Sequence, residues 1–315
     1  MTTPCRRQSP DASAADIAFV ETETPAGING DLRLTASQRE AYMRYHHGRN
    51  RANAETSRRA RITTLAAPAS SPPVDPGSTP ARAATLRFFE WAVRQLARSA
   101  VGRDVVIVDL GCGTGRQLEH FERAGYRGTY IGLDIARHRA WTDAPTARFR
   151  RELRVVDAHS IDPRSLPPFD LLVSSTALEH LRDDHRSLSL LRERLSPGGA
   201  EIHVVPGEAS LEVYGPHGWR QYSPACLERL FPGAEIFRLD GPFSRAVQRR
   251  ATSPAWDPAR RSLAKSRPGL FSTLREVALD LDRLCGNPRP TMYGVLARRE
   301  RSVHVPAEAS RRTAA

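Results

Sequence analysis

Cysteine is scarce in this 315-residue chain. Its four cysteines, Cys5, Cys112, Cys226 and Cys285, lie far apart and form no CxxC pair. This spacing argues against a disulfide framework and against a zinc site built on clustered cysteines. No run of about 18 apolar residues occurs, so we expect no membrane span. The N-terminus also lacks the charge and apolar pattern of a secretory signal. These absences together predict a cytoplasmic protein with reduced thiols.

Lysine is almost missing as well, because Lys265 is the only one and arginine supplies the other basic residues. The net charge is +12, but it is unevenly spread: +5 over residues 1–100, −2 over residues 101–240 and +9 over residues 241–315. The central region is therefore not basic. A GC-rich genome would explain the arginine bias, and no basic stripe with interleaved aromatic residues occurs. Nucleic acid as a partner is thus left open but is not favoured.

The centre of the chain contains a strand followed by a glycine-rich turn, VVIVDLGCGTGR at residues 105–116. Its first four residues are β-branched, which is typical of a parallel strand buried on both faces. Gly111, Gly113 and Gly115 then allow a tight turn and the close approach of a ligand. A dinucleotide fingerprint needs its third glycine at the sixth position, where Arg116 stands. A nicotinamide-dependent oxidoreductase is therefore disfavoured, and the turn predicts another cofactor site at the carboxyl end of a strand.

Strand and helix patterns alternate along the chain, which predicts an α/β fold with a doubly wound, mostly parallel sheet of seven strands. The expected strands are 105–110, 129–134, 153–157, 169–174, 200–205, 234–239 and 291–298. The expected helices are 36–62, 82–99, 117–124, 183–195, 224–231 and 271–284. Ser223 is expected to cap the fifth of these helices, with Pro224 at its first position.

The composition divides the chain into a core and flanking segments. Residues 1–80 are predicted to be an extension, disordered over 1–34 and proline-rich over 66–80; the helix between them is either a lid, a partner contact or a solvated helix. The core is expected at 81–240 and its last strand at 291–300. Residues 241–290 are expected to be a basic insertion with a helix, and residues 301–315 a disordered tail.

Acidic and small polar residues follow the predicted strands. Asp134 ends the second strand, where a carboxylate can accept hydrogen bonds from both hydroxyls of a ribose. Asp157 ends the third strand, and Ser174 ends the fourth. Each also has a plain structural interpretation, such as a helix cap or a turn residue.

Several of these motifs resemble those of the class I S-adenosylmethionine-dependent methyltransferases. The GxGxG turn after Asp109, the run LEHL at residues 178–181 and the run LSPGG at residues 195–199 are similar to the small-molecule members related to quinone biosynthesis. The resemblance covers about residues 83–240. It implies a Rossmann-like fold and S-adenosylmethionine as the cofactor, with no metal. It also implies cofactor contacts at Asp109, Gly111, Cys112, Gly113, Gly115, Asp134, Ile135, Asp157, Ala158 and Ser174, with Asp157 accepting from the adenine amine.

The acceptor side is predicted from YGPHGWRQY, residues 214–222, beside the carboxyl ends of the strands. We expect His217, ahead of His180, as a general base, although His180 is equally well explained by a structural role. Trp219 and Tyr222 would wall the pocket and Arg220 would hold an anionic acceptor; the alternative is a packing loop anchored by Trp219.

The sequence as a whole predicts an enzyme that methylates a small-molecule hydroxyl or amine by in-line transfer. A nucleic-acid methyltransferase that uses the basic flanks, in particular one acting on RNA, is an alternative. A non-catalytic scaffold with the same fold is another. The sequence leaves the acceptor and the oligomeric state undecided.

Overall fold

The computed structural model describes residues 28–68, 74–97, 102–142, 144–251, 262–285 and 289–299. Within these residues a single sheet has the strand order β1-β7-β8-β6-β5-β2-β3-β4. The strands are β1 (Leu65–Ala66), β2 (Val105–Leu110), β3 (Gly128–Asp134), β4 (Phe149–Val155), β5 (Phe169–Ser175), β6 (Leu195–Pro206), β7 (Glu235–Arg238) and β8 (Met292–Arg298). Neighbouring strands are parallel except that β8 runs antiparallel to β6 and β7. The predicted mostly parallel α/β sheet is confirmed.

Three details of the sheet differ from the expectation, the first being that β6 begins at Leu195, five residues before the expected strand 200–205. The sheet has eight strands because the two-residue β1 pairs with β7, and a strand this short carries no periodic pattern. The third expected strand, 153–157, is placed four residues too late at its start, because β4 begins at Phe149. β4 is an edge strand and its inner residues Arg150 to Arg154 are mostly polar. The apolar run that follows was therefore mistaken for the strand.

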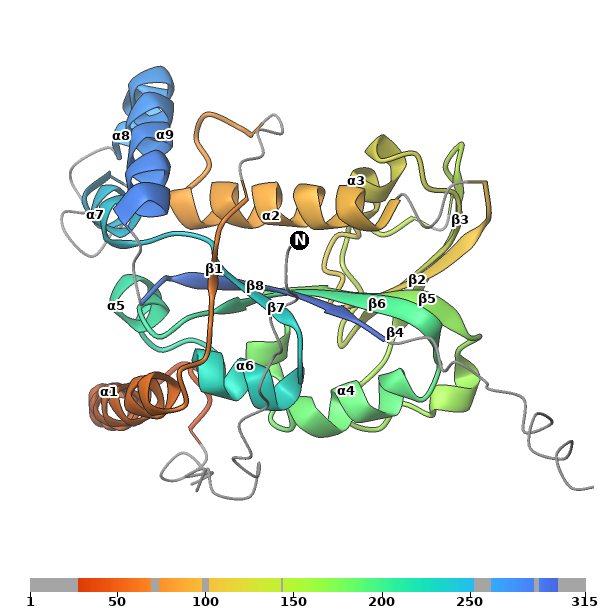
Figure 1. Cartoon of the computed structure of the whole chain (residues 1–315), viewed down its shortest axis with the longest axis horizontal. Helices are drawn as coiled ribbons and strands as arrows, with labels where there is room; N and C mark the ends of the chain where they lie inside the picture. Colours follow the sequence, from red (N-terminus) through yellow and green to blue (C-terminus); the bar gives the residue numbers. More distant parts are fainter. Residues whose placement is uncertain are drawn as a thin grey trace, which may run out of the picture.

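Helices cover both faces of the sheet (Figure 1). On one side lie α2 (Pro80–Ala97) and α3 (Leu118–Arg123), with α7 (Pro242–Ala251), α8 (Leu263–Ser266) and α9 (Pro268–Cys285) at one end. On the other side lie α1 (Ala36–Arg59), α4 (Asp184–Arg192) and α6 (Pro224–Leu230). Short elements complete the chain: α5 (Ser210–Tyr214) and the 3-10 turns η2 (Pro163–Ser165) and η3 (Leu178–His180).

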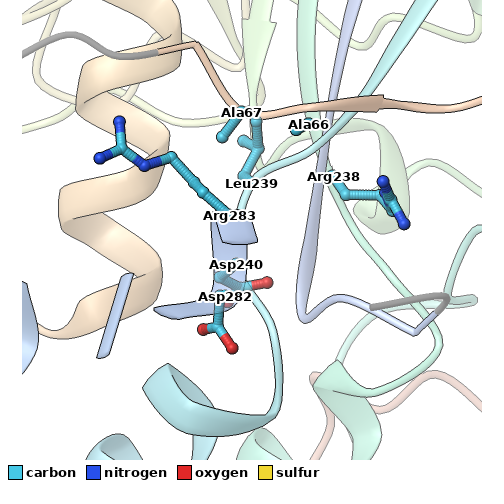
Figure 2. Close-up of a pocket in the computed structure, with 7 residues that line it drawn as sticks. All are labelled: Ala66, Ala67, Arg238, Leu239, Asp240, Asp282 and Arg283. Carbon is cyan, nitrogen blue, oxygen red and sulfur yellow. The ribbon is translucent and has the colours of Figure 1, made fainter. Parts of the chain in front are cut away.

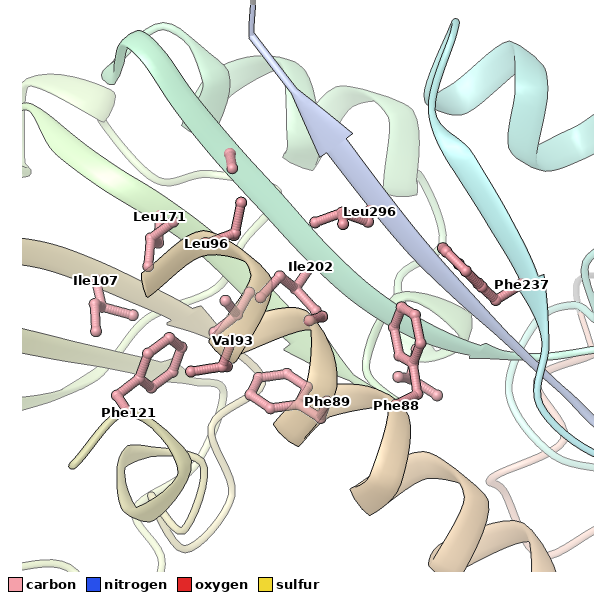
Figure 3. Packing of buried hydrophobic residues seen from close by; sticks show 14 of the residues in the cluster. Phe88, Phe89, Val93, Leu96, Ile107, Phe121, Leu171, Ile202, Phe237 and Leu296 are labelled. Carbon is pink, nitrogen blue, oxygen red and sulfur yellow. The ribbon is translucent and has the colours of Figure 1, made fainter. Parts of the chain in front are cut away.

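The alternation of strand side chains builds a separate apolar core on each face. In β2, Ile107 belongs to the cluster under α2, whereas Val108 belongs to the opposite cluster with the α4 and α6 side chains. Figure 3 shows α2 lying across the sheet with Phe88 and Val93 directed at the strands, while the Phe89 ring meets Phe121 of α3 with centroids 6.0 Å apart. Burial of such side chains contributes roughly 1.5–3 kcal/mol each to the stability of the fold. It therefore holds α2, which precedes β2 in the sequence, firmly on the sheet.

The expected disorder of residues 1–34 is wrong for residues 28–34, which have defined contacts. Gly30 N donates to Gly218 O over 2.8 Å, and Asp31 accepts from Gly218 N over 2.9 Å. The expected helix at 36–62 is confirmed as α1, which begins with a capping box at Thr35. The expected disorder of residues 1–27 and of the tail 301–315 concerns segments outside the described residues.

Candidate functional site

The glycine-rich turn sits where β2 and β3 end side by side. Gly111 N and Cys112 N both donate to Leu133 O, over 2.8 and 3.0 Å. Gly111 has a φ of +70°, and a Cβ there would lie 2.4 Å from Cβ of Ala177. Gly113 has a φ of +52°, and a Cβ there would meet nothing within 4 Å. The turn is therefore closed at Gly111 and open at Gly113, which suits the approach of a ligand to the backbone.

Asp134 borders this open turn. Its Oδ2 accepts from Gly113 N over 2.8 Å and its Oδ1 accepts from Ala136 N over 3.4 Å. The side chain is only partly buried, so its oxygens keep acceptor capacity for a ligand hydroxyl. Trp141 packs against the same loop and donates its Nε1 proton to Gly113 O. Sequence reasoning missed Trp141, which lies outside every recognised motif.

Asp109 supports the turn from behind. The side chain is 1% exposed and accepts a short hydrogen bond from the Tyr130 hydroxyl, while its Oδ1 has no hydrogen-bond partner. Burial raises the pKa of Asp109 to about 7, against the opposing effect of the Tyr130 hydrogen bond. A buried oxygen without a partner is costly, so a donor from a bound ligand would stabilise it.

The other predicted cofactor residues have varied surroundings. Cys112 is buried in the turn and Ile135 is 73% exposed beside Asp134. Asp157 lies in the loop after β4 and accepts from the backbone N and ring Nδ1 of His159. Ala158 is buried. A Cβ on Gly115 would contact the side chains of Arg151 and Leu153.

The prediction for Ser174 is wrong. Its side chain is fully buried, and its hydroxyl lies 2.8 Å from Nδ1 of His203, which in turn contacts Glu201. Arg192 of α4 completes this buried polar chain by pairing with Glu201 over 2.8 Å. The hydroxyl of Ser174 is therefore committed to the α4 face and does not reach a cofactor at the turn.

A cleft of about 860 Å³ connects the glycine turn to the ends of β5 and β6. Gly111, Cys112 and Gly113 line one part of it, and Glu179 and His217 line another. The side chains of α2, including Leu86 and Phe89, and the α3 side chains Glu119, His120 and Arg123 form further walls. The volume falls within the roughly 300–1,000 Å³ of small-molecule sites.

Asp31, Glu179, His180 and His217 form a polar cluster, of which Glu179 and His217 line the cleft. Asp31 Oδ2 lies 2.7 Å from Nδ1 of His180, and Asp31 Oδ1 lies 3.4 Å from Nδ1 of His217. The two imidazole rings meet edge to face with centroids 4.7 Å apart. Three distant chain segments therefore bring these groups together: the N-terminal segment, η3 and the loop after α5.

Electrostatics differ across the cluster. Burial alone would raise the pKa of Asp31, but the hydrogen bonds from His180 and Gly218 outweigh it and hold that pKa below its usual value. Burial lowers the pKa of His217, and the nearby His180 lowers it further. Burial raises the pKa of Glu179 to about 7. His217 is therefore neutral near pH 7, and Asp31 is ionised.

The predicted pocket residues Arg220, Tyr222 and Trp219 are not where the sequence placed them. Arg220 pairs with Asp184 over 2.5 Å, and the Tyr222 hydroxyl donates to the same carboxylate over 2.6 Å. Asp184 is itself buried, so it draws both side chains to the α4 side of the sheet. The guanidinium carbon of Arg182 lies over the Trp219 ring, 5.8 Å from the ring centroid. The prediction of these three as pocket residues is wrong, whereas Tyr214 and His217 of the same loop do line the cleft.

A second hollow lies at the β1 edge of the sheet (Figure 2). It is about 10 Å³ in volume and is lined by Ala66, Ala67, Arg238, Leu239, Asp240, Asp282 and Arg283. This is about the space of a single water-sized sphere. It is too small for a substrate.

Comparison with known families finds one match in the core. Residues 108–200 match the family model described as a methyltransferase domain. The matched stretch begins inside β2 and ends inside β6, so it includes the glycine turn, Asp134, Glu179 and His180.

Two curated relatives are similar to part of this chain. A trans-aconitate 2-methyltransferase from Deinococcus radiodurans is 35% identical over 125 residues, which cover 35% of this chain and 45% of that protein. The chain therefore spans less than half the length of this relative. A ubiquinone biosynthesis O-methyltransferase from Caulobacter vibrioides is 25% identical over 188 residues, covering 53% of this chain and 73% of that protein.

Among solved structures, a putative sarcosine dimethylglycine methyltransferase from Galdieria sulphuraria is similar with a TM-score of 0.43 and 18% identity. The match covers 69% of this chain and 86% of that one. The described part of the chain contains no helix that is both long and apolar enough to cross a membrane. The cytoplasmic location stays a prediction.

Proposed function

We propose that this chain, which carries a class I S-adenosylmethionine-dependent methyltransferase domain, methylates a hydroxyl or amine of a small molecule. The observation that carries the proposal is the single cleft that joins the open glycine turn to His217 and Glu179. A methyl donor at the turn and an acceptor at the polar cluster would share this cleft. Such a shared cleft is what in-line transfer between two bound molecules requires.

The residues at the turn fit the cofactor. Gly113 leaves space for a ligand against its backbone, Asp134 offers carboxylate oxygens for ribose hydroxyls, and Asp109 Oδ1 lacks a hydrogen-bond donor. Asp157 is exposed at the neighbouring strand end, where we propose that it meets the adenine amine. The chemistry that bound S-adenosylmethionine supplies is an electrophilic methyl group, because its sulfur keeps the electron pair of the breaking sulfur–carbon bond.

We propose His217, ahead of His180, as the first acceptor of the proton that the substrate loses. A hydroxyl or amine must give up a proton as its oxygen or nitrogen bonds to the methyl carbon. The His217 ring lines the cleft, its lowered pKa keeps it neutral, and Asp31 lies near its Nδ1 to stabilise the charged form. A neutral imidazole can accept a proton as a general base.

The acceptor is best matched by a small molecule. The cleft is of small-molecule size, and its walls combine apolar side chains such as Leu86 and Phe89 with many polar and charged ones. Arg82, Arg116 and Arg123 line it together with Glu119 and Glu179, so its charge is mixed and does not form the continuous basic track that binds a phosphate backbone. The names of the two relatives, which specify trans-aconitate and ubiquinone biosynthesis, support small-molecule methylation.

Isothermal titration of S-adenosylmethionine, S-adenosylhomocysteine and NAD tests the cofactor half of the proposal. We expect both adenosyl compounds to bind the wild-type chain and NAD not to bind. Asp134→Ala should weaken adenosyl binding at least 10-fold because the ribose hydroxyls lose their acceptor. Asp104→Ala is the matched control, since Asp104 lies at the opposite end of β2 with its side chain 74% exposed.

A folded wild-type chain that binds neither adenosyl compound would contradict the proposal. Equal weakening in Asp104→Ala and Asp134→Ala would show that the loss is not local to the turn. Binding by the wild type would justify a screen of small hydroxyl and amine acceptors with a labelled methyl donor.

A further inference from the structure

Glu179 is an unusual member of the polar cluster. Its side chain is completely buried apart from the cleft it borders, and neither carboxylate oxygen has a hydrogen-bond partner. Oε1 lies 3.8 Å from Nε2 of His180 and 3.9 Å from Nε2 of His217. These distances are too long for hydrogen bonds. An ionised carboxylate buried in this state costs free energy, which a retained proton or a bound cation would relieve.

The two histidines have a definite orientation. Asp31 lies at the Nδ1 edge of both rings, and Glu179 lies at the Nε2 edge of both. An ionised carboxylate only accepts hydrogen bonds, so the 2.7 Å contact places the His180 proton on Nδ1. The Nε2 lone pair of His180 is therefore left on the side that faces Glu179. Metal-binding histidines show this pattern, in which the outer nitrogen donates to a carboxylate.

The spacing suits a single ion. Ligand atoms about 2.1 Å from one metal lie at most about 4.2 Å apart, and the contacts from Glu179 to the rings fall inside that limit. A separate grouping, one carboxylate oxygen of Asp31 with one nitrogen from each ring, lies within 4.8 Å and shows only that the two imidazoles stand close together. Small side-chain rotations would close the set around an ion.

The backbone around the cluster is built for close approach. A Cβ on Gly30 would lie 2.2 Å from His217 N, and a Cβ on Gly218, with φ of +61°, would lie 2.5 Å from Glu179 O. The Tyr42 hydroxyl of α1 donates to the carbonyl oxygens of His217 and Gly218. Glycine and tyrosine thus fix the segment that carries Asp31 against the loop that carries His217.

We propose that Glu179, His180 and His217 bind one divalent transition-metal cation, with Asp31 as the outer partner of both imidazoles. Two nitrogen ligands and one carboxylate favour ions such as Zn²⁺, Mn²⁺ or Fe²⁺ over Mg²⁺ and Ca²⁺, which prefer oxygen ligands. The sequence resemblance implied no metal, and no spacing in the sequence predicts this one. Its ligands come from two segments, and Asp31 comes from a third.

A cation here would face the cleft opposite the glycine turn, because Glu179 and His217 both line it. Three protein ligands leave coordination positions open, and an acceptor oxygen in one of them would be polarised toward loss of its proton. With the cation bound, His217 is a ligand and that proton would leave to solvent, so His217 would act as the base proposed above only in the metal-free chain. This catalytic role rests on the proposed function, whereas metal binding itself does not.

Calorimetric titration of the full chain, freed of metal with EDTA and dialysed, tests the site with Zn²⁺ and Mg²⁺ as probes. We expect one Zn²⁺ per chain with a dissociation constant in the micromolar range or below, and at least 100-fold weaker Mg²⁺ binding. Glu179→Gln should weaken Zn²⁺ binding at least 100-fold. Asp31→Asn should weaken it about 10–100-fold, as expected for an outer partner. His185→Ala is the control, because His185 is an exposed histidine on α4.

Zn²⁺ binding that is unchanged in both Glu179→Gln and Asp31→Asn, or absent from the wild type, overturns the proposal. Glu179→Gln keeps the shape of the side chain and removes a buried charge, so it should fold. Titration of each variant with S-adenosylhomocysteine separates the two proposals. Metal binding without adenosyl binding would defeat only the proposed function, and adenosyl binding without metal binding would defeat only this inference.

Discussion

Single glycines determine how closely chain segments approach one another at the cleft. Gly111 combines a φ of +70° with a position where a Cβ would lie 2.4 Å from Cβ of Ala177. We expect Gly111→Ala to lower the free energy of unfolding by about 2–4 kcal/mol, from backbone strain and overpacking together, and to weaken adenosyl binding. Thermal and urea unfolding, with titration of S-adenosylhomocysteine, measure both effects.

Gly125 provides the matched control for Gly111. It has a φ of +86°, but a Cβ there would meet nothing within 4 Å. Gly125→Ala should therefore cost only the left-handed backbone strain of about 1–2 kcal/mol and should leave cofactor affinity unchanged. Equal losses in the two variants would contradict the role assigned to the contact between Gly111 and Ala177.

Asp240 is a buried carboxyl group whose pKa is set by its surroundings. It is buried near Asp282 (Figure 2), and its Oδ1 accepts from Thr291 N and Met292 N over 2.6 and 3.0 Å. Burial raises its pKa from 3.8 to about 7. Between these values the folded chain keeps the proton that the unfolded chain has lost. The wild type should therefore lose stability relative to Asp240→Asn as pH rises from about 4 to about 7, by up to about 1.4 kcal/mol per pH unit.

Urea unfolding of both chains at several pH values between 4 and 8 measures this difference. Asp104→Asn serves as the control, since Asp104 is exposed and pairs with Arg127 at the surface. A difference between wild type and Asp240→Asn that does not change with pH would show that Asp240 is ionised in the folded chain.

Residues near a recognisable local pattern were the ones that the sequence could predict. Asp134 follows a strand whose end is marked by its own apolar run, and the neighbouring glycines show the turn, so its place beside Gly113 was foreseeable. Arg220 was misassigned because its partner, Asp184, lies 36 positions away on another element. No local pattern reports a buried carboxylate at such a distance.

At the scale of elements, α1 is the least expected contributor to the site. The sequence predicts a helix here but gives no reason for where it packs. In the structure Tyr42 is 2% exposed, and its hydroxyl contacts the backbone of His217 and Gly218 as well as Gln221. Asp31, which precedes α1, reaches His180 across 149 positions of sequence. Contacts of this range depend on the whole fold, which is why sequence reasoning missed Asp31.

The packing of α1 makes a prediction for Tyr42→Phe. The ring keeps its place, but the carbonyl oxygens of His217 and Gly218 lose their donor, which should cost about 1–3 kcal/mol of stability. The loop that carries His217 should then be held less firmly, so the KM for the methyl acceptor should rise while affinity for S-adenosylhomocysteine stays the same. Unfolding experiments and steady-state kinetics with an identified acceptor measure these effects.

Tyr126→Phe separates loss of stability from loss of the site. The Tyr126 hydroxyl is also buried and donates to Val93 O over 3.0 Å, but it lies under α2, away from the cleft. We expect a similar fall in stability with no change in the KM for the acceptor. An acceptor KM that responds equally in both variants would remove the link between α1 and the site.

At the scale of the whole molecule, the order of strands is what brings the cofactor residues together. β2 lies between β3 and β5, so the strand ends that carry Asp109 and Asp134, two of the residues proposed to bind the cofactor, meet at one edge of the sheet. The alternation of strands and helices was enough to predict this arrangement. The alternation could not predict the extra strand β1 or the contacts of residues 28–34, because both depend on short segments that carry no periodic pattern.

Because the adenosyl site joins elements that fold together, ligand binding should stabilise the molecule as a whole. A ligand that binds only the folded state at 100 times its dissociation constant contributes about 2.7 kcal/mol. For a domain of this size that corresponds to a rise in Tm of roughly 5–10 °C. We expect S-adenosylhomocysteine to produce such a rise in the wild type, and at the same concentration to produce little in Asp134→Ala. NAD should leave Tm unchanged, since Arg116 stands where a dinucleotide turn needs glycine. Scanning calorimetry measures these shifts for the wild type with S-adenosylhomocysteine, for Asp134→Ala with S-adenosylhomocysteine and for the wild type with NAD. A rise in Tm as large in Asp134→Ala as in the wild type would mean that the ligand binds away from the turn.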